Sequence, residues 1–174
     1  MSPQQAEIRY HQVVTQIAAA ELQHNRPSGS VQLLAVSKTR NSAEIREMVA
    51  LGQRRYGENY LQEALLKIDE LADLPIEWHF IGPIQSNKTR PIAESFSWVH
   101  SVDRLKIAQR LNDQRPSHLP PLNICIQVNV SGEQSKSGCS LEALDEFAAA
   151  TIQLPNISLR GLMTIPQSAS SFDE

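Results

Sequence analysis

The chain has 174 residues, of which 41% are hydrophobic and 20% are charged, a composition typical of a single soluble globular domain. Its net charge is −3, and its basic residues are scattered among acidic ones, so nucleic acid is not the expected partner. No apolar run approaches the roughly 20 residues that span a bilayer, and the N-terminus lacks a signal-peptide pattern. The sequence therefore predicts a cytoplasmic protein without a membrane segment. The cysteines and histidines lack metal-ligand spacing, so no metal is expected.

Short strand-like runs alternate along the chain with amphipathic helical stretches, a pattern typical of a parallel sheet covered by helices. A helix is expected before the first strand. Ser2 and Pro3 suit its N-terminus, and it should end near residues 25–29. Its expected buried face, at helical spacing, consists of Tyr10, Val13, Val14 and Ile17.

The first strand is expected at residues 31–36, and the helix after it begins with Asn41 and Glu44 at capping-box spacing and stops at Gly52. Five more strands are expected, with helices between them. These strands lie at residues 55–57, 78–81, 98–102, 122–130 and 157–163. The helix that follows residues 98–102 should be capped by Ser101 or Asp103. Six such strands fit either a doubly wound sheet or a barrel, and periodicity does not choose between the two folds.

In both folds the loops that leave the C-terminal ends of the strands build the active site, and Lys38 occupies such a position. It is the one lysine of five that directly follows a long apolar strand. Its amine should lie over a low-dielectric interior, where desolvation disfavours the charged form. A neutral amine attacks aldehydes, so Lys38 is a candidate for a Schiff base with a carbonyl compound. Position alone is also compatible with a solvated lysine that ends a strand.

Other strand ends are also rich in polar residues that could line the same mouth. Asn59 follows the second strand, and His79 lies within the third. Both have structural alternatives, because Asn59 could cap the next helix and His79 could be a core histidine bonded to the backbone. The loop at residues 131–138 does not match the phosphate-binding GxxxxGK pattern, which argues against a nucleoside triphosphate.

Several longer segments occur together in a specific order. They are LLAVSKTR (33–40), YGENYLQEAL (56–65), WHFIGPIQSNK (78–88), SVDRLKIAQRLN (101–112), ICIQVNVSGEQSKSG (124–138) and LRGLMTIP (159–166). Over nearly the whole chain this joint pattern resembles the pyridoxal 5′-phosphate (PLP) homeostasis protein family. The resemblance implies a (β/α) barrel like the N-terminal domain of alanine racemase, with PLP held as a Schiff base on Lys38. It also implies that Val36, Asn59, His79 and Met163 lie around the cofactor.

For function, the resemblance implies a carrier of PLP that acts in vitamin B6 homeostasis and amino-acid balance without turnover of its own. PLP-dependent enzymes are the expected acceptors. Residues 1–174 are expected to form a single barrel domain that stops after about six βα units, before the family's phosphate-binding loops. A monomer is expected, with association possible through the exposed barrel edges.

Three alternatives stay open at this stage. A racemase-like enzyme would need a second acid–base group, which the racemases take from a separate β-domain. A Schiff-base aldolase would also place a lysine on a barrel strand. A cofactor-free interaction module would remain if this chain did not bind PLP.

Overall fold

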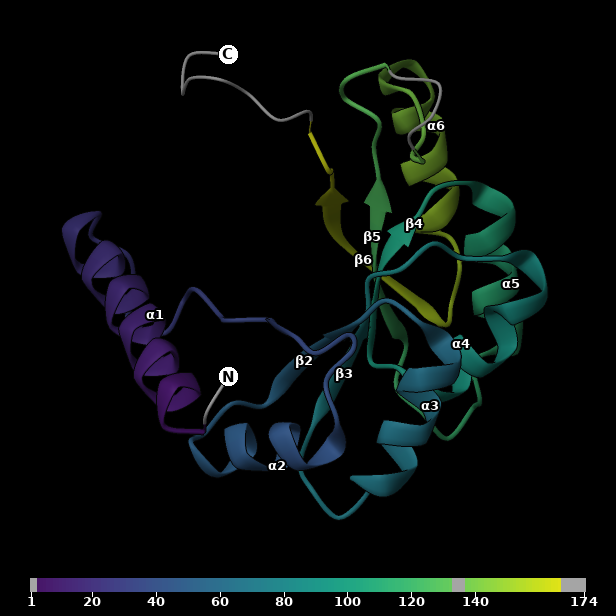
Figure 1. Ribbon diagram of the computed structural model, residues 1–174. Helices are drawn as coiled ribbons and strands as arrows, with labels where there is room; N and C mark the ends of the chain where they lie inside the picture. The colour runs from purple at the N-terminus through teal and green to yellow at the C-terminus, as the bar shows by residue number, and fades with distance from the viewer. Residues whose placement is uncertain (1–2, 133–136, 167–174) are drawn as a thin grey trace.

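The computed structural model describes residues 3–132 and 137–166. In this part of the chain, six parallel strands form one sheet (Figure 1). The strands are β1 (Ala35–Val36), β2 (Arg55–Glu58), β3 (Glu77–Phe80), β4 (Trp98–Val102), β5 (Leu122–Gln127) and β6 (Ile157–Met163). The helices are α1 (Pro3–Gln23), α2 (Ser42–Ala50), α3 (Leu61–Glu70), the 3-10 turn η1 (Ser86–Lys88), α4 (Thr89–Ser95), α5 (Leu105–Gln114) and α6 (Leu141–Thr151).

The order of the strands distinguishes between the two folds that the sequence left open. The order in the sheet is β1-β2-β3-β4-β5-β6, so each strand pairs with its neighbours in the chain. A doubly wound sheet would reverse its order at a switch point and carry helices on both faces. Figure 1 instead shows a curved sheet with α2 to α6 on its outer side, as in a (β/α) barrel. The barrel-type fold is confirmed.

The hydrophobic core lies between the sheet and the outer helices. Alternate strand residues face this layer, as the pleat requires. Tyr56 of β2 is buried, and its hydroxyl donates to the carbonyl of Ile45 in α2. Phe80 of β3 meets Phe96 edge-on, with ring centroids 5.3 Å apart. The remaining strand residues face the concave side of the sheet.

The helix boundaries follow local sequence signals in part. The capping box of α2 is confirmed, because the Asn41 side chain accepts from the backbone N–H of Glu44 and the Glu44 side chain accepts from that of Asn41. The stop at Gly52 is confirmed as well, with a left-handed φ of 105°. The predicted cap of α5 was wrong. Ser101 donates to the carbonyl of Gly82 and Asp103 pairs with Arg104, so neither side chain caps the helix. Ser2 lies outside the described residues.

Two expectations about the N-terminal part were wrong. The strand expected at residues 31–36 is confined to Ala35–Val36, because β1 pairs only with β2 and only these two residues have partners in its register. The expected buried face of α1 is largely open: Val13 and Val14 are 38% and 40% exposed. Val14 instead borders a cavity of about 330 Å³ between α1 and the segment before β1.

Where the structure describes the chain, no helix is long and apolar enough to span a bilayer.

Candidate functional site

Lys38 lies in the turn that leaves β1, two residues beyond the end of the strand. Its side chain is exposed, so the expectation that its amine lies over a low-dielectric interior was wrong. β1 is an edge strand of two residues, and it provides too little surface to cover a long side chain. Within residues 3–132 and 137–166 the Lys38 amine makes no hydrogen bond or ion pair. The amine is therefore available to a ligand at the C-terminal edge of the sheet.

Three of the other predicted site residues lie close to this edge on adjacent strands. Val36 pairs in register with Gly57 of β2, which pairs with His79 of β3, so the three positions form one row on the concave side. Asn59 follows the end of β2 and is half-buried. Met163, the fifth predicted residue, lies on β6, which is the edge strand farthest from β1 in the six-stranded sheet.

Gly57 leaves the middle of this row without a side chain. A Cβ placed there would lie 3.2 Å from Cδ1 of Ile81 and 3.5 Å from Cδ2 of Leu34. Gly82, two residues after the end of β3, is under a stricter limit, because a Cβ there would lie 2.0 Å from the carbonyl oxygen of Asn59. Glycine at position 82 thus allows the loop after β3 to pack directly on the backbone of Asn59.

His79 is buried and bonded to side chains, so it lacks the backbone partners that the core alternative expected. Its Nε2 lies 3.0 Å from Oε1 of Glu77, and its Nδ1 lies 2.9 Å from Nε2 of His100. Burial lowers the pKa of His79 to about 4, and it also lowers the pKa of His100. Both rings are therefore neutral at pH 7. Because the Glu77 carboxylate only accepts, His79 donates through Nε2 and accepts from His100 at Nδ1.

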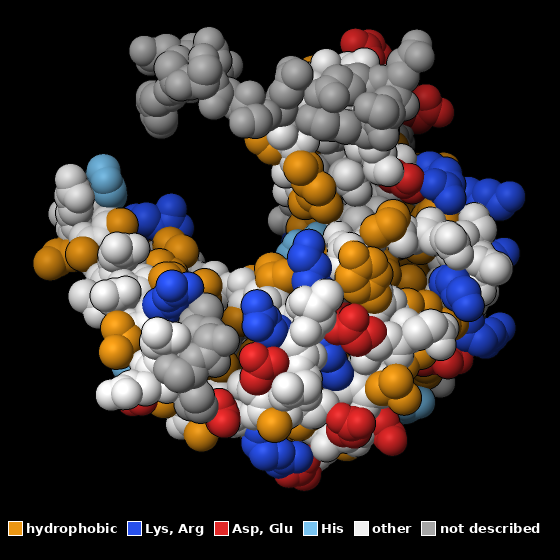
Figure 2. All heavy atoms as spheres, in the orientation of Figure 1, with side chains coloured by type: hydrophobic (Ala, Val, Ile, Leu, Met, Phe, Trp, Pro, Cys, Tyr) orange, Lys and Arg blue, Asp and Glu red, His pale blue; other side chains and the backbone are white. Residues whose placement is uncertain are grey.

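An aromatic side chain and a basic side chain lie beside this histidine pair on the concave side. The Trp98 ring stacks on His79 with centroids 5.5 Å apart and on His100 at 5.7 Å. The Arg160 guanidinium lies 5.9 Å from the Trp98 ring, and its Nε donates to Oδ1 of Asn123. Figure 2 shows a deep hollow on this side of the molecule. The concave surface thus presents flat rings and polar atoms.

A buried lysine supports the Lys38 turn from the outer side. Lys67 of α3 donates to the carbonyl of Ser37 at 2.8 Å, to Oε1 of Glu58 at 2.8 Å and to Oε1 of Glu63 at 2.5 Å. Sequence reasoning missed this group. The available signal was a charged residue on the apolar face of α3, at helical spacing from the buried residue Ala64.

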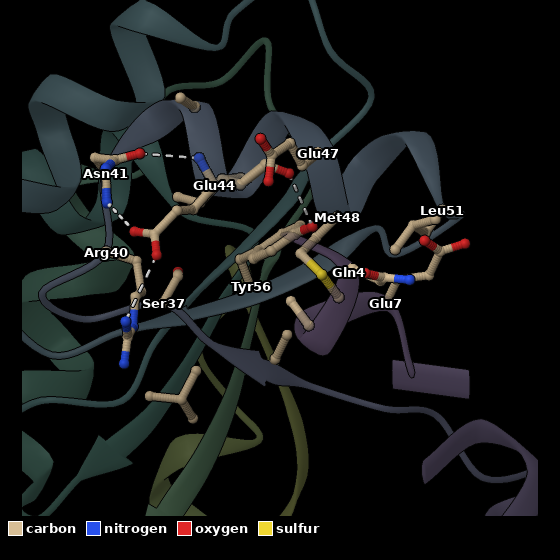
Figure 3. A pocket seen from close by; sticks show the side chains of 15 residues that line it. Gln4, Glu7, Ser37, Arg40, Asn41, Glu44, Glu47, Met48, Leu51 and Tyr56 are labelled. Atoms are coloured by element: carbon tan, nitrogen blue, oxygen red, sulfur yellow. Dashed lines mark hydrogen bonds and ion pairs between the residues drawn. The ribbon is translucent and has the colours of Figure 1, made fainter. Parts of the chain in front are cut away.

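A separate cavity of about 680 Å³ lies between α1, α2 and β1 (Figure 3). In Figure 3, Met48 of α2, Tyr56 of β2 and Gln4 of α1 converge on it. Val36 is among the lining residues, whereas Lys38, Asn59 and His79 are not. Because Tyr56 faces the outer helices, this cavity lies mainly on the outer side of the sheet, and Val36 is the residue of the concave row that borders it.

The barrel-type fold and the match to a family model together place the chain in the class of alanine racemase N-terminal domains. The model described as "Alanine racemase, N-terminal domain" matches residues 16–174.

Where the structure describes the chain, no group of three or more His, Cys, Asp or Glu side chains is placed to hold a metal ion.

More specific relatives narrow this class. The pyridoxal phosphate homeostasis protein of Pseudomonas aeruginosa is 66% identical over 155 residues, which are 89% of this chain and 67% of that protein. The protein of the same name from Escherichia coli K12 is 54% identical over 164 residues, covering 92% and 70%. The structure of PipY from Synechococcus elongatus with PLP bound is 40% identical, with a TM-score of 0.75 and coverage of 88% and 71%. The chain belongs to the pyridoxal phosphate homeostasis protein family.

Proposed function

We propose that this chain binds PLP as a Schiff base on Lys38 and acts in PLP homeostasis and amino-acid balance, without turning over a substrate of its own. The names of the relatives and the PLP bound to PipY support this proposal. The single observation that carries it is the Lys38 amine, which is exposed and, within the described residues, unpaired at the C-terminal edge of a barrel-type sheet.

The residues present fit an aldehyde cofactor. Of the described lysines, Lys67 is buried with all three ammonium hydrogens engaged, whereas Lys38 is the one that leaves the end of a strand. Gly57 adds no side chain of its own beside Val36, and two apolar side chains already border the position that its Cβ would take. Asn59 has a side-chain amide at the same edge that can hydrogen-bond to a polar ring substituent.

When bound, PLP supplies an aldehyde that condenses reversibly with an amine and can be passed to another amine. The chain's own residues present the Lys38 amine and surround the bound cofactor. His79 is neutral and already bonded to Glu77 and His100, so it is suited to shape the floor of the site and poorly suited to shuttle protons. We place Met163 at the far side of the cofactor, and we expect PLP-dependent enzymes to be the acceptors. We also propose a cytoplasmic monomer.

The test is a titration of the purified chain with PLP, followed by visible absorbance. Wild type and Lys106→Ala, which alters an exposed lysine on α5, should show the same band and dissociation constant. Lys38→Ala should weaken binding by at least about two orders of magnitude, because loss of the covalent bond and of an ordered contact exceeds 2.7 kcal/mol. Equal binding by Lys38→Ala and wild type would refute the proposal. Multiple turnovers of an amino acid would favour the racemase-like alternative.

A further inference from the structure

The turn that carries Lys38 is held from both sides by one pair of charged residues on α3. The carbonyl of Ser37, directly before Lys38, accepts from Nζ of Lys67 at 2.8 Å. The backbone N–H of Thr39, directly after Lys38, donates to Oε1 of Glu63 at 2.7 Å. Lys67 and Glu63 also bind each other at 2.5 Å, one helical turn apart. Both peptide groups that flank Lys38 are therefore fixed to the same helix.

The base of this arrangement is buried. Lys67 and Ser37 are 5% and 4% exposed, and Glu58 is fully buried. Oε1 of Glu58 accepts from both Lys67 and the Ser37 hydroxyl, at 2.8 and 2.6 Å. A buried ammonium with three acceptors has a fixed position, because any displacement leaves a charged group without a partner. The anchor of the turn is therefore rigid.

The backbone of the turn requires such an anchor. Thr39 has φ 63°, in the left-handed region, which is rare for a β-branched residue. A strained conformation of this kind persists only where its surroundings impose it. The Lys67 ammonium holds the pKa of the Glu63 carboxyl below its usual value, and the Thr39 N–H lowers it further, so Glu63 accepts as a carboxylate.

We propose that Lys67 and Glu63 form a clamp that sets the direction of the Lys38 side chain, with both acting as positioning residues for PLP binding. This inference rests on the proposed function, because it takes Lys38 as the point of attachment. The edge strand β1 has only two residues and cannot fix the turn by itself. Strand pairing continues as far as the Ser37 N–H, which donates to the carbonyl of Gly57, and the clamp adds order beyond it. An ordered amine reacts with less loss of conformational freedom than a mobile one.

The decisive variant is Glu63→Ala. The Glu63 side chain is one-third exposed, and its removal leaves the buried contacts of Lys67 with Ser37 and Glu58 in place, so the fold should be retained. Asp69→Ala is the matched control, since it removes an exposed carboxylate from the same helix. Glu63→Gln keeps an oxygen acceptor for the Thr39 N–H, so it should resemble wild type more closely than Glu63→Ala does.

Two measurements on these variants test the clamp. The first is hydrogen exchange of the Thr39 amide by NMR without PLP, and the second is the dissociation constant for PLP. Glu63→Ala should exchange at least about tenfold faster and bind about tenfold more weakly, which corresponds to about 1.4 kcal/mol. Asp69→Ala should match wild type in both.

The possible failures can be told apart. Unchanged Thr39 exchange in Glu63→Ala would overturn the clamp. Faster exchange with unchanged PLP affinity would overturn its positioning role. If wild type formed no adduct at Lys38, the proposed function would fail, and the exchange experiment would still decide whether the clamp exists.

Discussion

The β1 edge of the sheet and its middle are built differently. At one edge, β1 has two residues and leaves Val36 52% exposed, yet it leads into the turn that carries Lys38. In the middle of the sheet, β3 buries Phe80 against Phe96 on the outer side, and β3 and β4 bring a neutral histidine pair together on the concave side. The residue proposed to carry the cofactor thus lies where the sheet contributes least order. Charged contacts from α3 supply order that strand pairing does not.

The two lysines of this region show the same difference. Lys67 is buried and has three acceptors, whereas Lys38 is exposed and, within the described residues, has none. A buried lysine with three acceptors contributes to structure and cannot easily leave them for a ligand. A lysine without such contacts is free to react. These different surroundings support the proposal that one lysine serves the fold and the other binds the cofactor.

The largest expected effect concerns the middle of the sheet. Phe80→Ala should lower the free energy of unfolding by about 3–5 kcal/mol, because it leaves a cavity beside Phe96 in a packed core. Urea unfolding followed by circular dichroism measures the change. Leu22→Ala, at a position 81% exposed on α1, is the control and should stay close to wild type. A loss below 1 kcal/mol for Phe80→Ala would show that the middle of the sheet is no better packed than its edge.

The histidine pair predicts a dependence of stability on pH. The folded pKa of His79 is about 4, below its ordinary value of 6.5, so the unfolded chain binds more protons between these values. Its contribution is complete above pH 6.5 and is lost as the pH falls towards 4, by on the order of 3 kcal/mol. The groups that face it are Glu77, His100 and Arg55.

Unfolding free energies measured from pH 7 to pH 4 check this prediction. His79→Gln should have a shallower slope than wild type, and His118→Gln, at an exposed histidine, should keep the wild-type slope. Equal slopes for wild type and His79→Gln would contradict the account of a buried neutral histidine.

The smallest effect is expected at the edge. Val36→Ala removes a side chain that is half exposed, so the free energy of unfolding should change by less than about 1 kcal/mol. The same urea experiment measures it. A loss as large as that of Phe80→Ala would show that the edge is as well packed as the middle, and the contrast between the two regions would be lost.

The sequence was informative for several features that depend on local signals. The strands expected at residues 98–102 and 157–163 coincide with β4 and β6, and the capping box of α2 forms as its spacing predicts. The position of Lys38 after the first strand followed from its place in the chain. The choice between a doubly wound sheet and a barrel needed strand order, which depends on contacts between distant segments.

Other features depend on tertiary contacts that no local pattern reveals. The pairing of Lys67 with the Ser37 carbonyl joins residues 30 positions apart in the sequence. The partners of His79 on β4 likewise depend on how neighbouring strands are aligned. The exposure of Lys38 was predicted incorrectly, because the sequence suggested a long buried strand before it and the register with β2 leaves only two paired residues.

The most direct test of the central claim is to identify the residue that carries the adduct. The chain is incubated with PLP, reduced with borohydride and digested, and the modified peptide is located by mass spectrometry. The account predicts one dominant modified lysine, Lys38, and no adduct on the buried Lys67. An adduct distributed over the exposed lysines, or concentrated on a lysine other than Lys38, would contradict it.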